Sequence, residues 1–410
     1  MLRLFKYTIY SLFFPIVLTF GAQAAVINAT SCSQIDVQAA INSAIDGDVV
    51  VVPSGNCTWT NTVSILNKAI TIKGAGIDQT VITDSTPSGW EQNALLINNL
   101  SGKSITVTGF TFKGGTGSEG ILQIKGGTKK FRIDHIKFDN PSTRCIQIFG
   151  YTYGVIDNCT WNVGQSSGIQ GVSVIADGDD AWNRDLTLGT ENAVYVENCT
   201  FNYSNLNDGA LDAYGGARYV FRYNTVVGTS VGHHGRDSGG YRSTHSFEIY
   251  NNTFNNTGTA VFTSMNFRGG TGVVFGNTIT GNYNNFMYVH NYRSCGSYAP
   301  AGICDGSSVY DGNESGKEGY PCQDQIGRTT GQTLSPLYEW NNTYKGGNGD
   351  IVVSNDCTRM TTLHIIQNRD FYNDTPKPGY IPYTYPHPLT LSSNPSETVP
   401  PAPPKNLRVQ

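Results

Sequence analysis

A regularly repeated segment is the feature that most constrains how this chain can fold. Eight strings share one pattern, a short β-rich run beside a polar turn: TGFTF, IDHIKF, IDNCTW, VENCTF, RYNTVV, IYNNTF, FGNTIT and EWNNTY. Their alignment produces one column, which holds Gly109, His135, Asn158, Asn198, Asn224, Asn251, Asn277 and Asn341. The intervals are 26, 23, 40, 26, 27, 26 and 64 residues. A period of about 25 residues is typical of a solenoid, and the two longer gaps indicate inserted loops.

The repeat predicts an all-β fold, a single-stranded right-handed parallel β-helix with an N-terminal capping helix and two long loop insertions. The repeats show no helical periodicity and are rich in Asn, Thr and Gly. In such a solenoid the strands of successive coils lie about 4.8 Å apart. Asn suits the turn because it tolerates left-handed backbone and hydrogen-bonds its neighbours. We therefore expect Asn198, Asn224, Asn251 and Asn277 to stack successively.

The segment before the repeats supports the same fold. Residues from about Asp36 to Ile45 have the pattern of an amphipathic helix, which would cover the first coil of the solenoid. The strings DGDVVVVPSG and ITIKGAG follow. With this opening the chain resembles the pectate-lyase-like right-handed β-helix superfamily, as a divergent member. The resemblance covers most of residues 25–390 and implies the fold. It implies less about activity, because one fold hosts many functions.

The two ends of the chain differ from the repeat region. Residues 1–24 begin with a basic segment, continue with the apolar string SLFFPIVLTF and end in AQA, the pattern of a cleaved signal peptide. No other apolar run approaches the length of a membrane span, so we expect a secreted protein in the periplasm, in the medium or on the cell surface. Residues 391–410 are rich in proline and predict a flexible tail or linker. We expect residues 25–390 to form the β-helix, as a monomer.

Charge and cysteine content limit the partners and the compartment. Cleavage of the signal would remove two positive charges and change the formal net charge from −4 to −6. A mildly acidic chain argues against a nucleic-acid partner, because nucleic acid requires a basic surface. Nine cysteines are compatible with disulfides in an oxidising compartment. Cys159 and Cys199 would lie within disulfide range if they stack on adjacent coils, and two buried thiols are equally compatible with the sequence.

The candidate reaction centre is the string GHHGRDSGGYRSTHSF. It contains three of the seven histidines of the chain, His233, His234 and His245. Residues at equal offsets from the Asn column should be neighbours in space. Arg242 and Arg268 each precede a column residue by nine positions, so we expect them to stack and to bind an anionic group together. The alternative is that nearby carboxylates neutralise them.

The two insertions should wall this centre. They cover about residues 176–190 and 290–328, and they supply flat rings for stacking on sugars and cations for an anionic polymer. The predicted substrate-binding residues are Trp182, Arg236, Tyr241, Tyr292 and Arg293. Carboxylates in DGDD and DGALD offer the oxygen ligands that calcium prefers. The predicted metal ligands are Asp179, Asp180, Asp208 and Asp212. Asp208 and His234 share the same offset of ten residues, so we expect them to face each other.

These residue types suit β-elimination on an acidic polysaccharide. Arginine or calcium would neutralise the uronate carboxylate, and histidine, which titrates near neutral pH, would remove the C5 proton. Two motifs resemble those of pectate lyases, DGxxD at Asp208 to Asp212 and the Arg-x-Gly string at Arg268 to Gly270. The RxPR string that carries the catalytic arginine of many pectate lyases is absent, so the resemblance implies a divergent lyase.

Two other functions remain open on the sequence alone. Hydrolysis requires two carboxyl groups about 5 to 9 Å apart, which Asp208 and Asp212, or Asp179 and Asp180 with Asp208, would supply. A non-catalytic surface or adhesive protein that binds polysaccharide is the other alternative. It gains support if His234 and Arg268 lie far apart or are buried in ion pairs.

Overall fold

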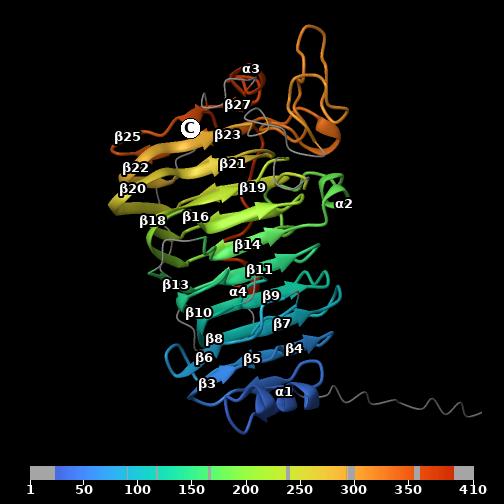
Figure 1. Ribbon diagram of the computed structural model, residues 1–410, viewed down its shortest axis with the longest axis vertical. Coiled ribbons are helices and arrows are strands. Elements are labelled where there is room, and N and C mark those ends of the chain that lie inside the picture. Colours follow the sequence, from blue (N-terminus) through green and yellow to red (C-terminus); the bar gives the residue numbers. More distant parts are fainter. Residues whose placement is uncertain are drawn as a thin grey trace, which may run out of the picture.

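The computed structural model describes residues 24–391 except 90, 117–118, 165–167, 237–240, 292, 294–300 and 355–360, and it leaves out the side chains of residues 205, 208, 361 and 362. The predicted signal peptide up to residue 23, the tail from residue 392 and Tyr292 lie outside the described residues. In Figure 1 the coils are stacked along the long axis, with α1 (Gln34–Ser43) at one end and β27 (Phe371–Tyr372) near the other.

The strands form one network of 27 members, in which each coil pairs in parallel with the coils before and after it. The pairing divides the strands into three stacks, one for each side of the coil. The first stack contains β1 (Val26–Asn28), β2 (Val49–Val51), β5 (Thr71–Lys73), the N-terminal parts of β8 (Ile105–Gly114) and β10 (Phe131–Pro141), β12 (Gly154–Asp157), β15 (Val194–Glu197), β17 (Arg218–Arg222), β19 (Ser246–Tyr250), β21 (Thr271–Phe275), β23 (Leu337–Trp340) and β27.

Four strands bend from the second stack into the third: β16 (Thr200–Tyr214), β18 (Thr225–His233), β20 (Thr253–Phe267) and β22 (Thr278–Val289). The second stack also contains β3 (Gly55–Trp59), β6 (Thr80–Asp84), the C-terminal parts of β8 and β10, β13 (Thr160–Val163) and β24 (Thr343–Tyr344), which pairs antiparallel with β25 (Gly347–Asn348). The third stack also contains β4 (Val63–Leu66), β7 (Leu95–Asn98), β9 (Leu122–Lys125), β11 (Ile146–Phe149), β14 (Val172–Ile175) and β26 (Ile351–Val353). A parallel β-helix, as the repeat predicts, is therefore the architecture of the described chain.

The turn column of the repeat is present, but with a register correction. Backbone φ is positive at Gly109, His135, Asn158, Asn198, Tyr223, Asn251, Gly276 and Asn341. Tyr223 and Gly276 thus occupy the positions at which we expected Asn224 and Asn277. The expectation that Asn198, Asn224, Asn251 and Asn277 stack successively is therefore wrong, because pairs such as Asn251-Asn252 allow the alignment to slip by one residue.

The asparagines that do stack are the buried ones directly after the turn: Asn224, Asn252, Asn277 and Asn342. Oδ1 of Asn252 accepts from the backbone N–H of Asn224 at 2.9 Å, and the same bond recurs from Asn252 to Asn277 and from Asn277 to Asn342, at 3.0 Å each. Each side-chain amide also donates to the next Oδ1. This Asn ladder satisfies polar groups that would otherwise be buried without partners.

The interior of the coil is apolar and contains stacked aromatic side chains. Phe138, Trp161 and Phe201 are in register on β10, β13 and β16, and their ring centroids lie 5.4 Å and 4.3 Å apart in turn. Because equivalent positions of successive coils are in register, each ring packs on the ring of the next coil. Helix α1 covers the first coil with three buried side chains, Val37, Ala40 and Ile41.

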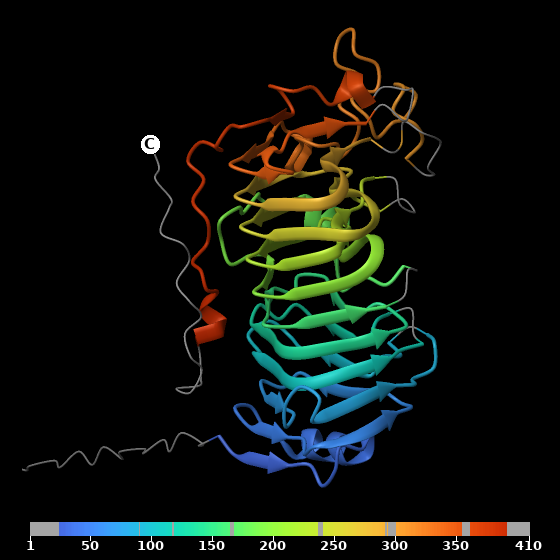
Figure 2. The same cartoon turned by 90° about the vertical axis from the view of Figure 1, so that its left-hand side faces the viewer.

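Two insertions and the C-terminal segment complete the fold. The first insertion follows β14 and contains α2 (Asp179–Trp182), and the second separates β22 from β23 and contains η2 (Thr330–Gln332). In Figure 1 α2 and the second insertion lie on the same side of the stack. The chain then passes α3 (Thr361–His364) and β27 and returns along the outside to α4 (Pro388–Leu391), as Figure 2 shows.

Buried ionic groups attach this returning segment to the first stack. The Arg222 guanidinium is fully buried, binds Glu197 and donates to the carbonyl oxygens of Tyr383 and Thr384 at 2.8 and 2.9 Å. Glu248 accepts from the Tyr380 hydroxyl. Burial raises the pKa of Glu248. The returning segment therefore supplies partners for the buried charges on the outer face of the first stack. It also packs apolar side chains, among them Leu389, against a buried apolar cluster on the same face.

Disulfides connect Cys32 to Cys57 and Cys304 to Cys322. Cys159 and Cys199 precede the paired residues Thr160 and Thr200 on adjacent coils, and both remain buried free thiols. Of the two arrangements open on the sequence, the structure has the unbridged one. Within the described ranges, no helix has the length and apolar character needed to cross a membrane.

Candidate functional site

The candidate site lies on the outer face of the third stack. In strands, side chains alternate between the two faces. Leu211 of β16 is level with Val172 of β14 and Val231 of β18, and all three are fully buried in the core. Positions one and three residues further along the strands therefore belong to the outer face. Asp212 occupies the first of these positions on β16.

The outward positions three residues beyond the level of Leu211 form a row at the ends of four adjacent strands. Because His233, Phe267 and Val289 are mutually in register, the residue after each of them lies in the same row. The row consists of Tyr214, His234, Arg268 and His290. Tyrosine and histidine, which can transfer protons, and arginine, which can bind an anion, therefore lie on neighbouring coils.

The central contacts of the site join Asp212, His234 and Arg268. Nε2 of His234 lies 3.1 Å from Oδ2 of Asp212, and Nδ1 lies 2.7 Å from Nη2 of Arg268. A guanidinium group only donates hydrogen bonds, so Nδ1 is the acceptor and the imidazole proton is on Nε2, facing the carboxylate. The Asp212 side chain is 4% exposed and that of His234 is 27% exposed. We call this group the Asp212–His234–Arg268 cluster.

Neighbouring polar groups hold Asp212 in place. Its Oδ2 accepts from Nε2 of Gln170 at 3.0 Å, and its Oδ1 accepts from the backbone N–H of Ala213 at 2.9 Å. Gln170 is in turn bound by Nε of Arg144 at 2.6 Å. These bonds fix the carboxylate so that it orients the imidazole, the role of a carboxylate behind a catalytic histidine. Gln170 and Arg144 could not be predicted from the repeat, because both lie on connections between strands, outside the repeat pattern.

Two tyrosines border the cluster on its open side. The ring of Tyr214 meets the His234 ring edge-on at 5.6 Å, and Tyr241 lies 5.3 Å from Tyr214. Tyr241 is 56% exposed, so its ring is accessible from the solvent. Burial raises the pKa of Tyr214 to about 12, so its hydroxyl is protonated at neutral pH. On the next coil, Nε2 of His290 lies 3.1 Å from Oδ1 of Asn266.

The other two histidines of the predicted centre lie in the interior. His233 is 1% exposed, stacks on Phe267 at 4.4 Å and faces the Gly269 carbonyl oxygen at 2.9 Å. His245 is fully buried against Trp182 and lies 3.0 Å from the Thr329 hydroxyl. Burial lowers the pKa of both, to about 3 for His245. Both side chains are neutral core groups, and neither reaches the outer face.

Arg242 does not join Arg268 and instead connects the two insertions. Its guanidinium binds both carboxylate oxygens of Asp324 at 2.6 and 2.7 Å and Oδ1 of Asp179 at 2.7 Å. Asp179 belongs to the first insertion and Asp324 to the second. The pairing of β19 with β21 aligns Ser246 with Thr271, which places Arg268 level with Ser243 and one residue away from Arg242. Of the two arrangements expected from the sequence, anion binding by paired arginines or neutralisation by nearby carboxylates, Arg242 therefore has the second.

The predicted sugar-binding residues divide into exposed and internal ones. Trp182 is fully buried, so it offers no face to a sugar. Arg293 is 1% exposed and forms a bidentate pair with Asp311 at 2.8 and 2.9 Å. Arg236 is half-buried and donates to Gln323 at 3.0 Å. Tyr241 is thus the exposed ring of the set within the described chain, and Tyr292 lies outside it.

Three of the four predicted calcium ligands have described side chains, and each of these carboxylates contacts an arginine or a histidine. The Asp179 carboxylate binds Arg242, that of Asp180 binds Arg184 at 2.6 Å, and that of Asp212 binds His234. The side chain of Asp208, expected to face His234, is outside the described residues. In the described part of the chain, the one group of close metal-ligating atoms is Cys304, Asp311 and Cys322, and its two sulfurs form a disulfide. A disulfide beside a single carboxylate does not fit calcium, which binds several oxygen ligands. The mechanism proposed below therefore includes no metal.

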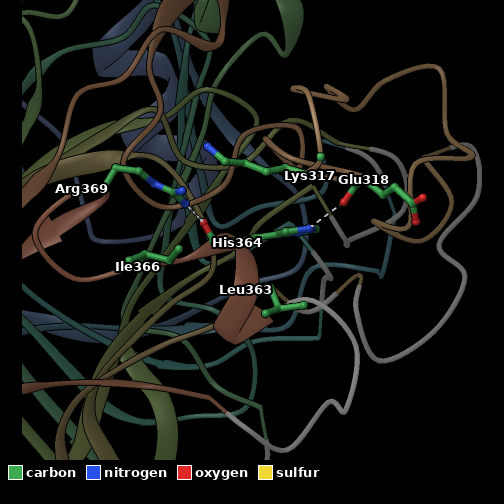
Figure 3. Close-up of a pocket in the computed structure, with 7 residues that line it drawn as sticks. Lys317, Glu318, Leu363, His364, Ile366 and Arg369 are labelled. Atoms are coloured by element: carbon green, nitrogen blue, oxygen red, sulfur yellow. Dashed lines mark hydrogen bonds between the residues drawn. The ribbon is translucent and has the colours of Figure 1, made fainter.

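A pocket of about 400 Å³ lies apart from the cluster, beside α3. Figure 3 shows its lining, with Lys317 and Glu318 from the second insertion and Leu363, His364, Ile366 and Arg369 from the end of the solenoid. Arg369 binds Asp370 at 2.7 Å, and Lys317 binds Glu314 at 3.3 Å. The cations of this pocket are therefore already paired with carboxylates, and none of its residues belongs to the predicted centre.

Comparison with known proteins yields weak similarities. No family description matches the chain, and no curated protein matches its sequence. Among solved structures, the ORF18 protein of Geobacillus virus E2 is 14% identical, with a TM-score of 0.35, and the match covers 65% of this chain and 60% of the viral protein. An alginate lyase from Paenibacillus sp. str. FPU-7 is 14% identical, with a TM-score of 0.35, over 65% of this chain and 93% of the lyase.

A third structure is the catalytic domain of a GH87 alpha-1,3-glucanase in complex with nigerose. It is 13% identical, with a TM-score of 0.33, over 88% of this chain and 69% of that domain. Two of these three proteins are, by name, enzymes that act on polysaccharides. At such low identity and TM-score, these similarities do not assign a function to the chain.

Proposed function

We propose that this protein is a secreted polysaccharide lyase that cleaves an acidic, uronate-containing polysaccharide by β-elimination. We further propose the right-handed coil of the pectate-lyase-like superfamily for it, since parallel crossover connections are right-handed in nearly all cases. The observation that carries the proposal is the Asp212–His234–Arg268 cluster, in which a base and a carboxylate-binding cation stand side by side on an outer face. Secretion is supported by the N-terminal sequence and by the two disulfides.

The arrangement of the cluster provides for a base that substrate activates. Without substrate, Arg268 occupies the lone pair of His234 Nδ1. A uronate carboxylate is a stronger partner for the guanidinium than a neutral imidazole, because the charged pair forms charge-assisted bonds. When Arg268 binds the carboxylate, Nδ1 becomes available beside the sugar. Asp212 then stabilises the imidazolium through Nε2 as proton transfer proceeds.

The elimination step balances with groups of the site. Nδ1 of His234 removes the C5 proton, and the electrons of the C–H bond form the C4=C5 double bond as the C4–O glycosidic bond breaks. The leaving oxygen takes a proton from the Tyr214 hydroxyl, which later regains one through His234 and solvent. Arg268 stabilises the charge that develops on the carboxylate group in the transition state. The products are one unsaturated chain end and one new reducing end.

Hydrolysis is less well supported by the contacts of Asp212. It requires a second carboxyl group across the scissile bond. In the described part of the structure the side-chain partners of Asp212 are Gln170 and His234, an amide and an imidazole. Both of these partners contact Oδ2, and Oδ1 accepts from the backbone N–H of Ala213. A carboxylate held in this way is suited to orient a histidine rather than to activate water.

Incubation with a panel of uronate polymers tests the proposal. The expected result is an increase in ultraviolet absorbance from unsaturated ends, in step with new reducing ends. Reducing ends without that absorbance would establish a hydrolase instead. Binding of a polymer with neither signal would establish the non-catalytic alternative. The panel should include neutral glucans, on which we expect no activity.

A further inference from the structure

A second pocket, behind the first insertion, has the composition of an anion site. Its volume is about 450 Å³, and its lining includes Lys129, Tyr151, Tyr153, Arg184, Asp185 and Arg218. The tyrosines come from the turn between β11 and β12, Arg218 begins β17, and Arg184 and Asp185 follow α2. The first insertion separates this pocket from the Asp212–His234–Arg268 cluster, since Asp179 of α2 faces Arg242 whereas Arg184 contacts Tyr151.

Arg218 is the central group of this pocket. It is 4% exposed, and its guanidinium donates to the carbonyl oxygens of Arg184 at 3.0 Å, Ala181 at 3.3 Å and Asp185, and to the Thr187 hydroxyl at 3.0 Å. Among the ion pairs of the described residues, none includes Arg218. Its hydrogen bonds are thus satisfied by neutral acceptors, and the acid whose charge acts on it, the exposed Asp185, forms no ion pair with it. A buried charge without a partner is costly, so such a site favours an anion.

Two more cations face the same space. The Arg184 guanidinium lies 3.2 Å from the Tyr151 ring centroid, and Nζ of Lys129 lies 5.8 Å from that of Tyr153. Arg184 has an exposed partner, Asp180, and exposed pairs are weak. Asp185 is the acid of the lining, and it is exposed. In the pocket beside α3, by contrast, Arg369 and Lys317 each bind a carboxylate.

The tyrosines distinguish this pocket from a simple anion site. The rings of Tyr151 and Tyr153 lie 6.0 Å apart and nearly perpendicular, at 71°. Flat aromatic faces pack against sugar rings, and their hydroxyls bond to sugar oxygens. The Tyr151 hydroxyl is buried and has no hydrogen-bond partner among the described residues. A ligand with both a carboxylate and a sugar ring would meet the cations and the aromatic groups together.

We propose that this pocket binds an acidic sugar residue of the polymer at a distance from the site of cleavage. This inference rests on the proposed function for the nature of the polymer. Its role would be to hold a long chain on the enzyme between cleavage events, because two linked contacts raise the effective concentration of the polymer at the catalytic cluster. Short oligomers cannot reach both sites and would gain nothing from it.

Calorimetric titration and turnover assays with paired variants test this proposal. The double variant Lys129→Ala/Arg184→Ala keeps the buried Arg218 and should fold. A charge-matched control is Lys73→Ala/Lys345→Ala, which removes two exposed cations elsewhere. We expect the pocket variant to bind a uronate polymer at least tenfold more weakly than the control and to cleave a uronate trisaccharide at the unchanged rate.

The outcomes separate this inference from the proposed function. Polymer binding by the pocket variant as tight as that of the control would overturn the pocket. So would equal affinity of the native protein for sulfate and for a monomeric uronate, since that result would indicate an anion site without sugar recognition. Failure of the proposed function is a different observation, namely that the native protein binds uronate polymers but produces no unsaturated ends.

Discussion

Nδ1 of His234 lies 2.7 Å from Nη2 of Arg268, and the opposite nitrogen of the same ring lies 3.1 Å from Asp212. His234 and Arg268 are 34 positions apart in the sequence, and they meet because β18 and β20 end side by side. His233 and His245 of the GHHGRDSGGYRSTHSF string are buried, whereas the imidazole of His234 is partly exposed and lies between an acid and a cation. Several consequences for activity can be measured.

His234→Ala should reduce turnover of a uronate polymer by roughly a hundredfold to ten-thousandfold, the usual contribution of a positioned base. Asp212→Asn should also reduce turnover, because an amide nitrogen facing Nε2 favours the other tautomer. A suitable control is His135→Ala, which removes an exposed histidine from another coil. Initial rates of absorbance increase measure the effect, with thermal unfolding as the check on folding. Full activity of His234→Ala would remove this residue from the mechanism.

Arg268→Ala should reduce kcat/KM by about a hundredfold, or about 3 kcal/mol, because a charged contact made in the transition state is lost. The loss should be much smaller on a polymer whose carboxylates are methyl-esterified, since no anion remains for Arg268 to bind. The ratio of native to variant kcat/KM on the two substrates is the measurement. An equal loss on both substrates would mean that Arg268 supports the fold of the site and does not bind the carboxylate.

Tyr214→Phe should lower kcat while leaving KM nearly unchanged, since the hydroxyl acts only as the leaving group takes its proton. The phenyl ring keeps the edge-on packing against His234. Substrates with a good leaving group at C4 need no acid, so a uronide that carries an aryloxy group at C4 should be cleaved at similar rates by both proteins. A parallel loss on this C4-aryloxy substrate would contradict the role of Tyr214 as the acid.

The repeat predicted the architecture and the coils that hold the site, but not its residue pairs. Interior and exterior alternate along β18 from the buried Val231, so strand alternation alone assigns His233 to the core and His234 to the surface. The expected pairing of Arg242 with Arg268 is wrong because the alignment slips by one residue between adjacent asparagines. Such a slip exchanges the two faces of a strand.

Contacts made by the insertions could not be predicted from the repeat. Arg242 meets Asp324 over a separation of 82 residues, and the second insertion has no coil pattern that would place its acid. For the same reason, Trp182 could be predicted to lie in a loop but not to be buried. Gln170 and Arg144, which hold Asp212, lie on turns whose side-chain directions are set by tertiary packing.

His245 should make stability depend on pH. Burial, with smaller effects from Arg218 and Arg242, lowers its pKa to about 3 in the folded protein, whereas an unfolded histidine titrates near 6.5. Below about pH 6.5 the unfolded state therefore binds a proton that the folded state refuses, and stability falls as pH falls. Between pH 7 and pH 5 the loss from this residue is of the order of 2 kcal/mol.

His245→Phe keeps an aromatic ring against Trp182 and cannot take up a proton. Urea unfolding at pH 7 and pH 5 should therefore show a smaller decrease in the free energy of unfolding for this variant than for the native protein. Titration of other groups, including the buried carboxylates, is common to both proteins and cancels in the comparison. An identical pH dependence would show that His245 is solvated or protonated in the folded state.

Asn252→Ala should be strongly destabilising because it interrupts the Asn ladder at its centre. The Asn252 side chain accepts from the backbone N–H and the side-chain amide of Asn224, and it donates to the Phe221 carbonyl oxygen and to Asn277. Its removal leaves buried donors and acceptors without partners, each at a cost of about 1 to 3 kcal/mol.

Asn251→Gly, one residue earlier, is the control, because φ at Asn251 is 57° and glycine adopts that conformation readily. We expect urea unfolding to show a loss of at least about 3 kcal/mol for Asn252→Ala and less than about 1 kcal/mol for Asn251→Gly. Equal losses would show that the turn, and not the buried ladder, maintains the register of the coils.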